Sequence, residues 1–276
     1  MATSTDDPLV GDAAGALQAA EKRAERDFTP DIAAMLRITA DKARKLIADV
    51  GRLYTDRMMQ RFTDLRFNER LKRTNPFLLQ VRGVKTVRQW AENQVTSALF
   101  ASEEEAIGHV LETIAKACYP GGREPSLTED FDLEVSEPGK VTAFQIKMSW
   151  DCMPMSSRKN LSNTILRCRE HYREQGIEFK GVFAPCYGRA ETTKPPGQEY
   201  ISKRSREFWA EVGAGDPDYD FKVGQVCRLL CSEFRAELNA TAIPNLINRL
   251  ATEGARVFGD QNANIDYERL FRVINR

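Results

Sequence analysis

The sequence predicts an α/β (α+β) fold in which a small mixed sheet is flanked by helices. Strand-like segments are confined to the middle of the chain, at residues 131–135, 141–148 and 180–188. Apolar residues recur at three- and four-residue steps before, between and after these strands, which is the period of helices that cover a core. A chain of 276 residues is long enough to bury a sizeable core in one large domain or two modest ones.

The N-terminal third divides by composition. Residues 1–28 are rich in Ala, Asp, Thr and Gly, and we expect them to be poorly ordered. Residues 29–90 form a helical subdomain, because apolar positions from Ile32 to Phe62 follow the helical period. A basic segment at 61–90 lies within it. Such a segment is usually a solvated face, and it becomes a nucleic-acid contact only if a catalytic site lies nearby.

The remainder, residues 91–276, is expected to form the catalytic domain together with C-terminal helices. A helix is predicted at 102–117, with Ser102 as its N-cap and glutamates in its first turn. Pro138-Gly139 suits a type II turn between the first two strands. Further helices are expected at 156–175, 205–212, 221–238, 243–258 and 266–275.

Composition excludes several classes of protein. The 40 basic and 40 acidic residues balance, so a basic surface must be sought locally. The 6 cysteines lack the paired spacing of a zinc site and the chain holds only 2 histidines, which disfavours structural zinc. We interpret the cysteines as reduced. With no signal peptide and no apolar run of about 18 residues, we expect a cytoplasmic protein.

The hairpin predicts which side chains share a face. If Glu137 to Lys140 form the turn, Asp132 faces Gln145 and Asp130 faces Lys147. Alternation then gives one polar face and one apolar face. The polar face holds Asp130, Asp132, Glu134, Gln145 and Lys147, and the apolar face holds Phe131, Leu133, Val135, Phe144, Ile146 and Met148. A solvent-exposed face with cross-strand charge pairs is the alternative interpretation.

Asp132, Glu112 and Lys147 together suit phosphodiester cleavage. Mg²⁺ takes oxygen ligands, and one or two carboxylates suffice when phosphate oxygens and waters complete the shell. A lysine beside the cation can orient or deprotonate the attacking water. Gln145 is a neutral ligand or water-positioning group, and the carbonyl of Ile146 is a further candidate ligand. Asp130 competes with Asp132 for the role of catalytic acid.

The order of Asp132, the turn, Gln145 and Lys147 resembles the core of the PD-(D/E)XK nuclease superfamily, in which a helical glutamate such as Glu112 is common. Over most of its length the chain resembles type II restriction endonucleases of the subgroup that cuts interrupted GG/CC sites of the RGGNCCY type. The segments that carry this wider likeness are NPFLLQVRG (75–83), GHVLETIAKACYPGG (108–122), EFW (207–209) and DYERLFRVINR (266–276). The chain departs from the superfamily motif at Phe131, where proline is usual, and at Gln145, where an acid is usual.

The resemblance implies a restriction-endonuclease-like core and sequence-specific, Mg²⁺-dependent hydrolysis of double-stranded DNA. It also implies a homodimer and a cognate DNA methyltransferase. The stretch after Lys147 combines basic residues with Ser and Asn, which contact phosphates and base edges. The DNA-contact candidates are Ser149, Trp150, Ser156, Ser157, Arg158, Lys159, Asn160, Asn163 and Arg167, with Arg70, Lys72 and Arg73 as weaker ones. An ordinary exposed basic helix is the alternative.

Two other functions remain open on the sequence alone. One is a repair or recombination nuclease of the same superfamily that recognises DNA structure. The other is a DNA-binding or partner-binding protein without catalysis, in which the hairpin face is only solvated. Incubation with plasmid and Mg²⁺ separates them, since only a sequence-specific nuclease yields discrete bands.

Overall fold

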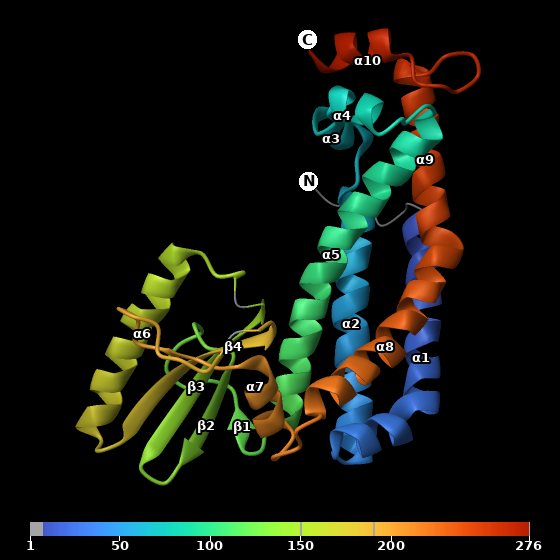
Figure 1. Cartoon of the computed structure of the whole chain (residues 1–276). Coiled ribbons are helices and arrows are strands. Elements are labelled where there is room, and N and C mark those ends of the chain that lie inside the picture. Colours follow the sequence, from blue (N-terminus) through green and yellow to red (C-terminus); the bar gives the residue numbers. More distant parts are fainter. Residues whose placement is uncertain (1–7, 150, 190, 276) are drawn as a thin grey trace. The chain divides into compact units, whose positions relative to one another are not determined.

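The computed structural model describes residues 8–149, 151–189 and 191–275 (Figure 1). Before the sheet come the helices α1 (Pro8–Leu36), α2 (Ala40–Asp64), α3 (Phe67–Lys72), α4 (Pro76–Val81) and α5 (Val87–Cys118). The middle of the chain holds β1 (Gly122–Arg123), β2 (Leu133–Glu137), β3 (Lys140–Ser149), α6 (Met155–Glu174), β4 (Glu178–Tyr187) and β5 (Ile201–Ser202). The last elements are α7 (Ser205–Val212), α8 (Tyr219–Glu237), the π-helix η1 (Leu238–Ala242), α9 (Ile243–Phe258) and α10 (Tyr267–Ile274).

The chain folds into two compact units. The helical unit takes the residues up to Ala24, Gly51–Ala106 and the residues from Cys231 onward, while the sheet unit takes Glu25–Val50 and Ile107–Leu230. This division does not follow the predicted boundaries after residues 28 and 90. The reason is that α1, α2, α5 and α8 each contribute to both units, which a segment-by-segment reading of composition cannot detect. Residues 8–28, expected to be poorly ordered, belong to α1.

The predicted small mixed sheet is confirmed. Its strand order is β1-β2-β3-β4-β5, with antiparallel pairing from β1 to β3 and parallel pairing from β3 to β5. The hairpin register is also as predicted, since Glu137 pairs with Lys140 and Leu133 pairs with Phe144. Gly139 has a φ of +74°, the left-handed value that the third position of a type II turn requires.

Helices cover both faces of the sheet, as the close approach of α6 and α7 to β4 illustrates (Figure 1). On the α6 face, Ile165 lies so near Gly181 that a Cβ there would be 2.3 Å from its Cδ1 and Cγ1 atoms. The cluster on that face consists of Phe131, Val141, Ala143, Met153, Leu161, Ile165, Cys168, Tyr172, Phe179, Phe183 and Tyr200. On the other face, the ring of Phe144 packs against Tyr119 and Phe208.

One detail of the predicted hairpin faces is wrong. Phe131 does not share the face of Leu133, because β2 begins only at Leu133 and the residues before it leave the regular alternation. Its ring instead packs 5.8 Å from the ring of Phe179, in the cluster under α6. Glu134 is only 2% exposed, which goes against the alternative interpretation of a solvent-exposed hairpin face. A carboxylate buried to this degree needs hydrogen-bond partners.

The predicted N-cap at Ser102 is also wrong. Helix α5 begins at Val87 and runs through Ser102, whose hydroxyl donates to the carbonyl of Ala98 one turn earlier, at 3.1 Å. The three glutamates that follow therefore lie in the middle of the helix.

In the helical unit, Trp90 packs against Phe67 and Phe258, and its indole N–H donates to the hydroxyl of Thr74. All six cysteines are free thiols. Among the described residues, no helix combines the length and apolar character needed to cross a bilayer.

Candidate active site

Asp132 directly precedes Leu133, the first residue of β2, and lies beside β3. Its backbone N–H donates to the carbonyl of Phe144 at 2.8 Å, although Phe144 is already the register partner of Leu133, so Asp132 is tied to β3 outside the regular ladder. Its carboxylate Oδ2 accepts from the backbone N–H of Ile146 at 2.6 Å and lies 3.8 Å from Nζ of Lys147. The side chains of Asp132 and Lys147 are 18% and 38% exposed, so both can be reached from solvent. The acid and the lysine predicted from the sequence thus meet.

Glu112 reaches the same place from α5. Its Oε1 accepts from Nζ of Lys116 one turn later at 2.9 Å, and its side chain is 22% exposed. Burial raises the pKa of Asp132, and the charge of Glu112 raises it further, while Lys147, the Ile146 N–H and Lys116 oppose the shift. Glu112 is thus close enough to Asp132 for its charge to act on the Asp132 carboxylate. The structure therefore brings Glu112, Asp132 and Lys147 together.

Lys116 is the residue of this cluster that the sequence reasoning missed. Burial favours its neutral form, but the hydrogen bond to Glu112 and the charges of Glu112, Glu124 and Asp132 raise the pKa of Lys116 overall. The four-residue spacing of Glu112 and Lys116 could have indicated this residue from the sequence, because residues four apart on a helix lie on the same face. The site thus holds two carboxylates and two ammonium groups.

Gln145 and Asp130 lie at the rim of this cluster. Nε2 of Gln145 donates to the backbone carbonyl of Asp130 at 3.1 Å, while its Oε1 is buried and has no partner among the described residues. The carboxylate of Asp130 accepts from the hydroxyl of Thr164 at 2.6 Å and lies 3.9 Å from Arg167, both on α6. Asp130 is thus engaged by α6, and this favours Asp132 over Asp130 as the acid beside Lys147.

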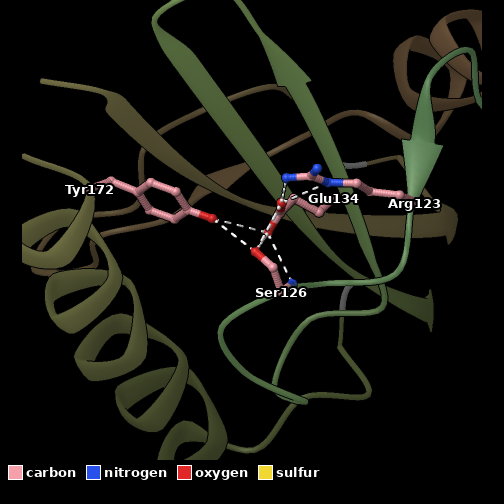
Figure 2. Close-up of polar contacts among 4 residues, drawn as sticks. All are labelled: Arg123, Ser126, Glu134 and Tyr172. Atoms are coloured by element: carbon pink, nitrogen blue, oxygen red, sulfur yellow. Dashed lines mark hydrogen bonds and ion pairs between the residues drawn. The ribbon is translucent and has the colours of Figure 1, made fainter. Parts of the chain in front are cut away.

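A second polar cluster holds the segment that leads into Asp132 (Figure 2). The buried carboxylate of Glu134 accepts from the guanidinium of Arg123 at 2.6 and 3.1 Å. The backbone N–H and the hydroxyl of Ser126 also donate to it, as does the hydroxyl of Tyr172 at 3.4 Å. Because Arg123 ends β1 and Ser126 lies in the connection from β1 to β2, Glu134 ties the start of this connection to the sheet and to α6.

The donor set at the main cluster fits a hard cation with few protein ligands. Within the part of the chain that the structure describes, no three His, Cys, Asp or Glu side chains converge as a metal site. Asp132 and Glu112 supply two carboxylates, and Gln145 has an unused buried oxygen. Mg²⁺ is commonly bound by one or two protein carboxylates, while phosphate oxygens and waters fill the remaining coordination positions.

The predicted DNA-contact residues after Lys147 divide into exposed and engaged positions. Ser149 is 7% exposed and its hydroxyl donates to Asp151. Trp150 lies outside the described residues. Nε of Arg158 donates to the carbonyl of Met153 at 3.0 Å. The remaining candidates share the exposed side of α6, opposite the buried face that packs on the sheet: Ser156, Ser157, Lys159, Asn160, Asn163 and Arg167.

The weaker candidates Arg70, Lys72 and Arg73 belong to the helical unit. Arg70 is 8% exposed, which leaves little of its surface for a phosphate. Burial lowers the pKa of Arg70, and the charges of Arg61 and Arg73 lower it further. Lys72 pairs with Glu69 at 3.2 Å, and Arg73 is exposed.

The chain matches a known protein family. A family model described as "Type II restriction endonuclease EcoO109I" matches residues 41–227. No curated protein matches the chain. The matched region spans more than half of the sequence and includes the whole sheet, α6, α7 and the cluster of Glu112, Asp132 and Lys147. The chain therefore belongs to the EcoO109I family of type II restriction endonucleases.

Proposed function

We propose that this protein hydrolyses phosphodiester bonds of double-stranded DNA at a short specific sequence, with Mg²⁺ as its cofactor. The observation that carries the proposal is the meeting of Asp132 with Lys147 at 3.8 Å, in electrostatic contact with Glu112. The same arrangement supports a PD-(D/E)XK active site in which Gln145 occupies the position of the second acid. The likeness to enzymes that cut RGGNCCY-type sites makes an interrupted GG/CC sequence the proposed target.

Asp132 and Glu112 would hold the cation, with the backbone carbonyl of Ile146 as a further ligand. A bound Mg²⁺ supplies positive charge to the scissile phosphate and lowers the pKa of a water. Asp132 is prepared for this role because its Oδ2 is fixed by the Ile146 N–H, which leaves Oδ1 without a hydrogen bond among the described residues. Gln145 offers its buried Oε1 to a water or a ligand without adding negative charge.

Lys147 would act on the attacking water. Its ammonium group lies at the rim of the acid cluster and is partly exposed, so a phosphate can approach it. In the reaction the water oxygen forms a bond to phosphorus while the bond from phosphorus to one sugar oxygen breaks. The water gives up a proton, and the leaving sugar oxygen takes one. Lys147 orients the water and offsets the charge that develops on the phosphate, and Lys116 adds a second positive charge close by.

The exposed side of α6 would contact the DNA beside this centre. Helix α6 begins six residues after the end of β3, so it starts near the end of the strand that carries Lys147. Asn and Arg side chains are suited to base edges, and Ser, Lys and backbone N–H groups to phosphates. We propose Asn160, Asn163 and Arg167 as base readers, with Ser156, Ser157 and Lys159 on the backbone. Arg158 and Ser149 support them from the buried side.

A symmetric target is most simply cut by a two-fold dimer, and we propose a homodimer on that ground. A host that carries such an enzyme must protect its own DNA, so a cognate methyltransferase is the proposed partner. The proposed compartment is the cytoplasm, where chromosomal DNA of a cell without a nucleus lies.

Incubation with supercoiled plasmid in Mg²⁺ tests the proposed function. Discrete linear fragments are expected, and sequencing of their ends gives the recognised sequence and the cut position. Cleavage only of branched or ended DNA would replace the proposal by a structure-specific nuclease. Absence of cleavage by a folded, DNA-binding protein in Mg²⁺ and in Mn²⁺ would overturn it.

A further inference from the structure

A cationic, partly aromatic pocket opens in the sheet unit next to the proposed centre. Its volume is about 750 Å³. Three arginines line it, Arg189, Arg204 and Arg206, against one acid, Asp220. Tyr187 and Phe221 also line it and are 52% and 67% exposed, so both rings are accessible to a molecule outside the chain.

Three residues that line the pocket are neighbours of the acid cluster in sequence, charge or strand pairing. Leu111, which lines the pocket, precedes Glu112 on α5. Cys186, another wall residue, is buried, and burial raises the pKa of its thiol to about 12 while the charges of Cys227, Glu112 and Asp132 add to the shift. Tyr187 pairs with Ser149, two positions beyond Lys147 on the parallel neighbour strand. The pocket wall and the acid cluster are therefore built on the same helix, α5, and on the paired strands β3 and β4.

The positive charge of the pocket is largely uncompensated. Neither Arg189 nor Arg204 has a hydrogen bond or ion pair from its guanidinium to any described residue, and both are exposed. Arg206 is partly engaged, since its Nε donates to the carbonyl of Pro217 at 3.1 Å and its Nη2 lies 3.4 Å from Asp218. Helix α7 begins at this wall without a side-chain cap, which leaves backbone N–H groups of its first turn open.

From this geometry we propose that the pocket binds the backbone phosphate next to the scissile one, with Arg189 and Arg204 as its ligands. Tyr187 and Phe221 cover the adjoining sugar or base. The inference rests on the proposed function and adds a site to it. Guanidinium groups form forked hydrogen bonds to phosphate oxygens, and exposed rings stack on nucleotides of any sequence. The pocket therefore holds the cut strand in place without reading its sequence.

The test measures DNA binding separately from cleavage. A labelled duplex that carries the cleaved sequence is titrated with protein at several salt concentrations, in Ca²⁺ so that it stays intact. Arg189→Gln and Arg204→Gln are each expected to reduce the slope of log affinity against log salt by about one. Tyr187→Ala is expected to weaken binding about tenfold with no change of slope. The matched control is Lys180→Gln near the opposite end of β4, which removes one positive charge outside the pocket.

Several outcomes decide the question. Unchanged slopes in both arginine variants, with wild-type binding intact, would overturn the pocket assignment but not the nuclease. An equal reduction of the salt slope in Lys180→Gln would also overturn the pocket assignment, because the reduction would then follow from net charge alone. Stabilisation of the wild type by inorganic phosphate, abolished in Arg204→Gln without any change in DNA affinity, would make the pocket a small-anion site and overturn the proposal. A wild type that neither binds nor cleaves DNA would instead overturn the proposed function.

Discussion

The carboxylate of Asp132 accepts a hydrogen bond from the backbone N–H of Ile146 at 2.6 Å. This contact fixes the acid to β3 through the residue that precedes Lys147. The 3.8 Å separation between the Asp132 carboxylate and the Lys147 ammonium group is therefore set by strand pairing and not only by the flexible lysine side chain. A site built on paired strands holds its reacting groups more rigidly than one built on loops.

Glu112→Gln should cut the rate of DNA cleavage at least about a hundredfold, the usual scale for loss of one charge-stabilising group. The amide keeps the size of the side chain but removes a carboxylate that couples to Asp132. The Mg²⁺ concentration that gives half-maximal cleavage should also rise. Single-turnover cleavage of plasmid across a Mg²⁺ titration measures both effects.

The matched control for that variant is Glu124→Gln. Glu124 also faces Lys116, at 3.8 Å, but is 80% exposed and lies outside the acid cluster. Its replacement should leave rate and Mg²⁺ requirement unchanged. Equal behaviour of the two variants would remove Glu112 from the site.

Glu134→Ala should lower the free energy of unfolding by about 2 kcal/mol, since the Ser126 N–H and the guanidinium of Arg123 lose their acceptor and the Tyr172 hydroxyl keeps only its contact with the Ser126 hydroxyl. Denaturant unfolding followed by circular dichroism measures the change. Glu137→Ala removes an exposed partner of Lys140 instead and should cost less than about 1 kcal/mol. A Glu134→Ala protein as stable as wild type would show that the cluster in Figure 2 does not hold this part of the sheet.

Gly181→Ala should destabilise the sheet unit by about 1–3 kcal/mol through overpacking, because a Cβ there would lie 2.3 Å from two atoms of Ile165. The second change Ile165→Ala removes both of those atoms. The double variant should be more stable than the sum of the two single effects predicts, and a double-mutant cycle of unfolding free energies detects this. Simple additivity would contradict the close approach of α6 to β4.

Asp216 should contribute a pH-dependent part of the stability. Hydrogen bonds from Lys222 and from the Asp218 N–H lower its pKa in the folded chain, and the charges of Lys222 and Arg37 act in the same direction. An acid with a lowered folded pKa stabilises the fold above its unfolded pKa of about 3.9, and this contribution is lost as the pH falls through the folded value. The stability difference between wild type and Asp216→Asn should thus be full at pH 7 and shrink below about pH 4. A constant difference over that range would contradict the lowered pKa.

Much of the fold could be predicted from the sequence because the signals were local. The Pro138-Gly139 turn fixed the hairpin register, which the structure has from Leu133 opposite Phe144 to Glu137 opposite Lys140. The helices from α6 to α10 follow apolar periods that single segments display. Helix α5 was predicted too short, because Ser102 has the chemistry of an N-cap but donates to Ala98 within a continuous helix.

What could not be predicted depends on tertiary packing. The position of Phe131 under α6 follows from where β2 becomes regular, which alternation cannot show. The pocket of Arg189 and Arg204 forms only because β4 pairs in parallel with β3 and α7 folds back beside it. The boundaries of the two units escape a linear reading because long helices belong to both.

The most direct test of the central assignment is plasmid cleavage in Mg²⁺ by Asp132→Ala, Lys147→Ala and Asp130→Ala, with DNA binding measured in parallel. Asp130 is the matched control, because it lies two residues away but its carboxylate is held by Thr164 and Arg167. Cleavage should be lost in the Asp132 and Lys147 variants while binding persists, and Asp130→Ala should cut DNA like the wild type. Full cleavage by Asp132→Ala together with loss of cleavage in Asp130→Ala would contradict the site described here.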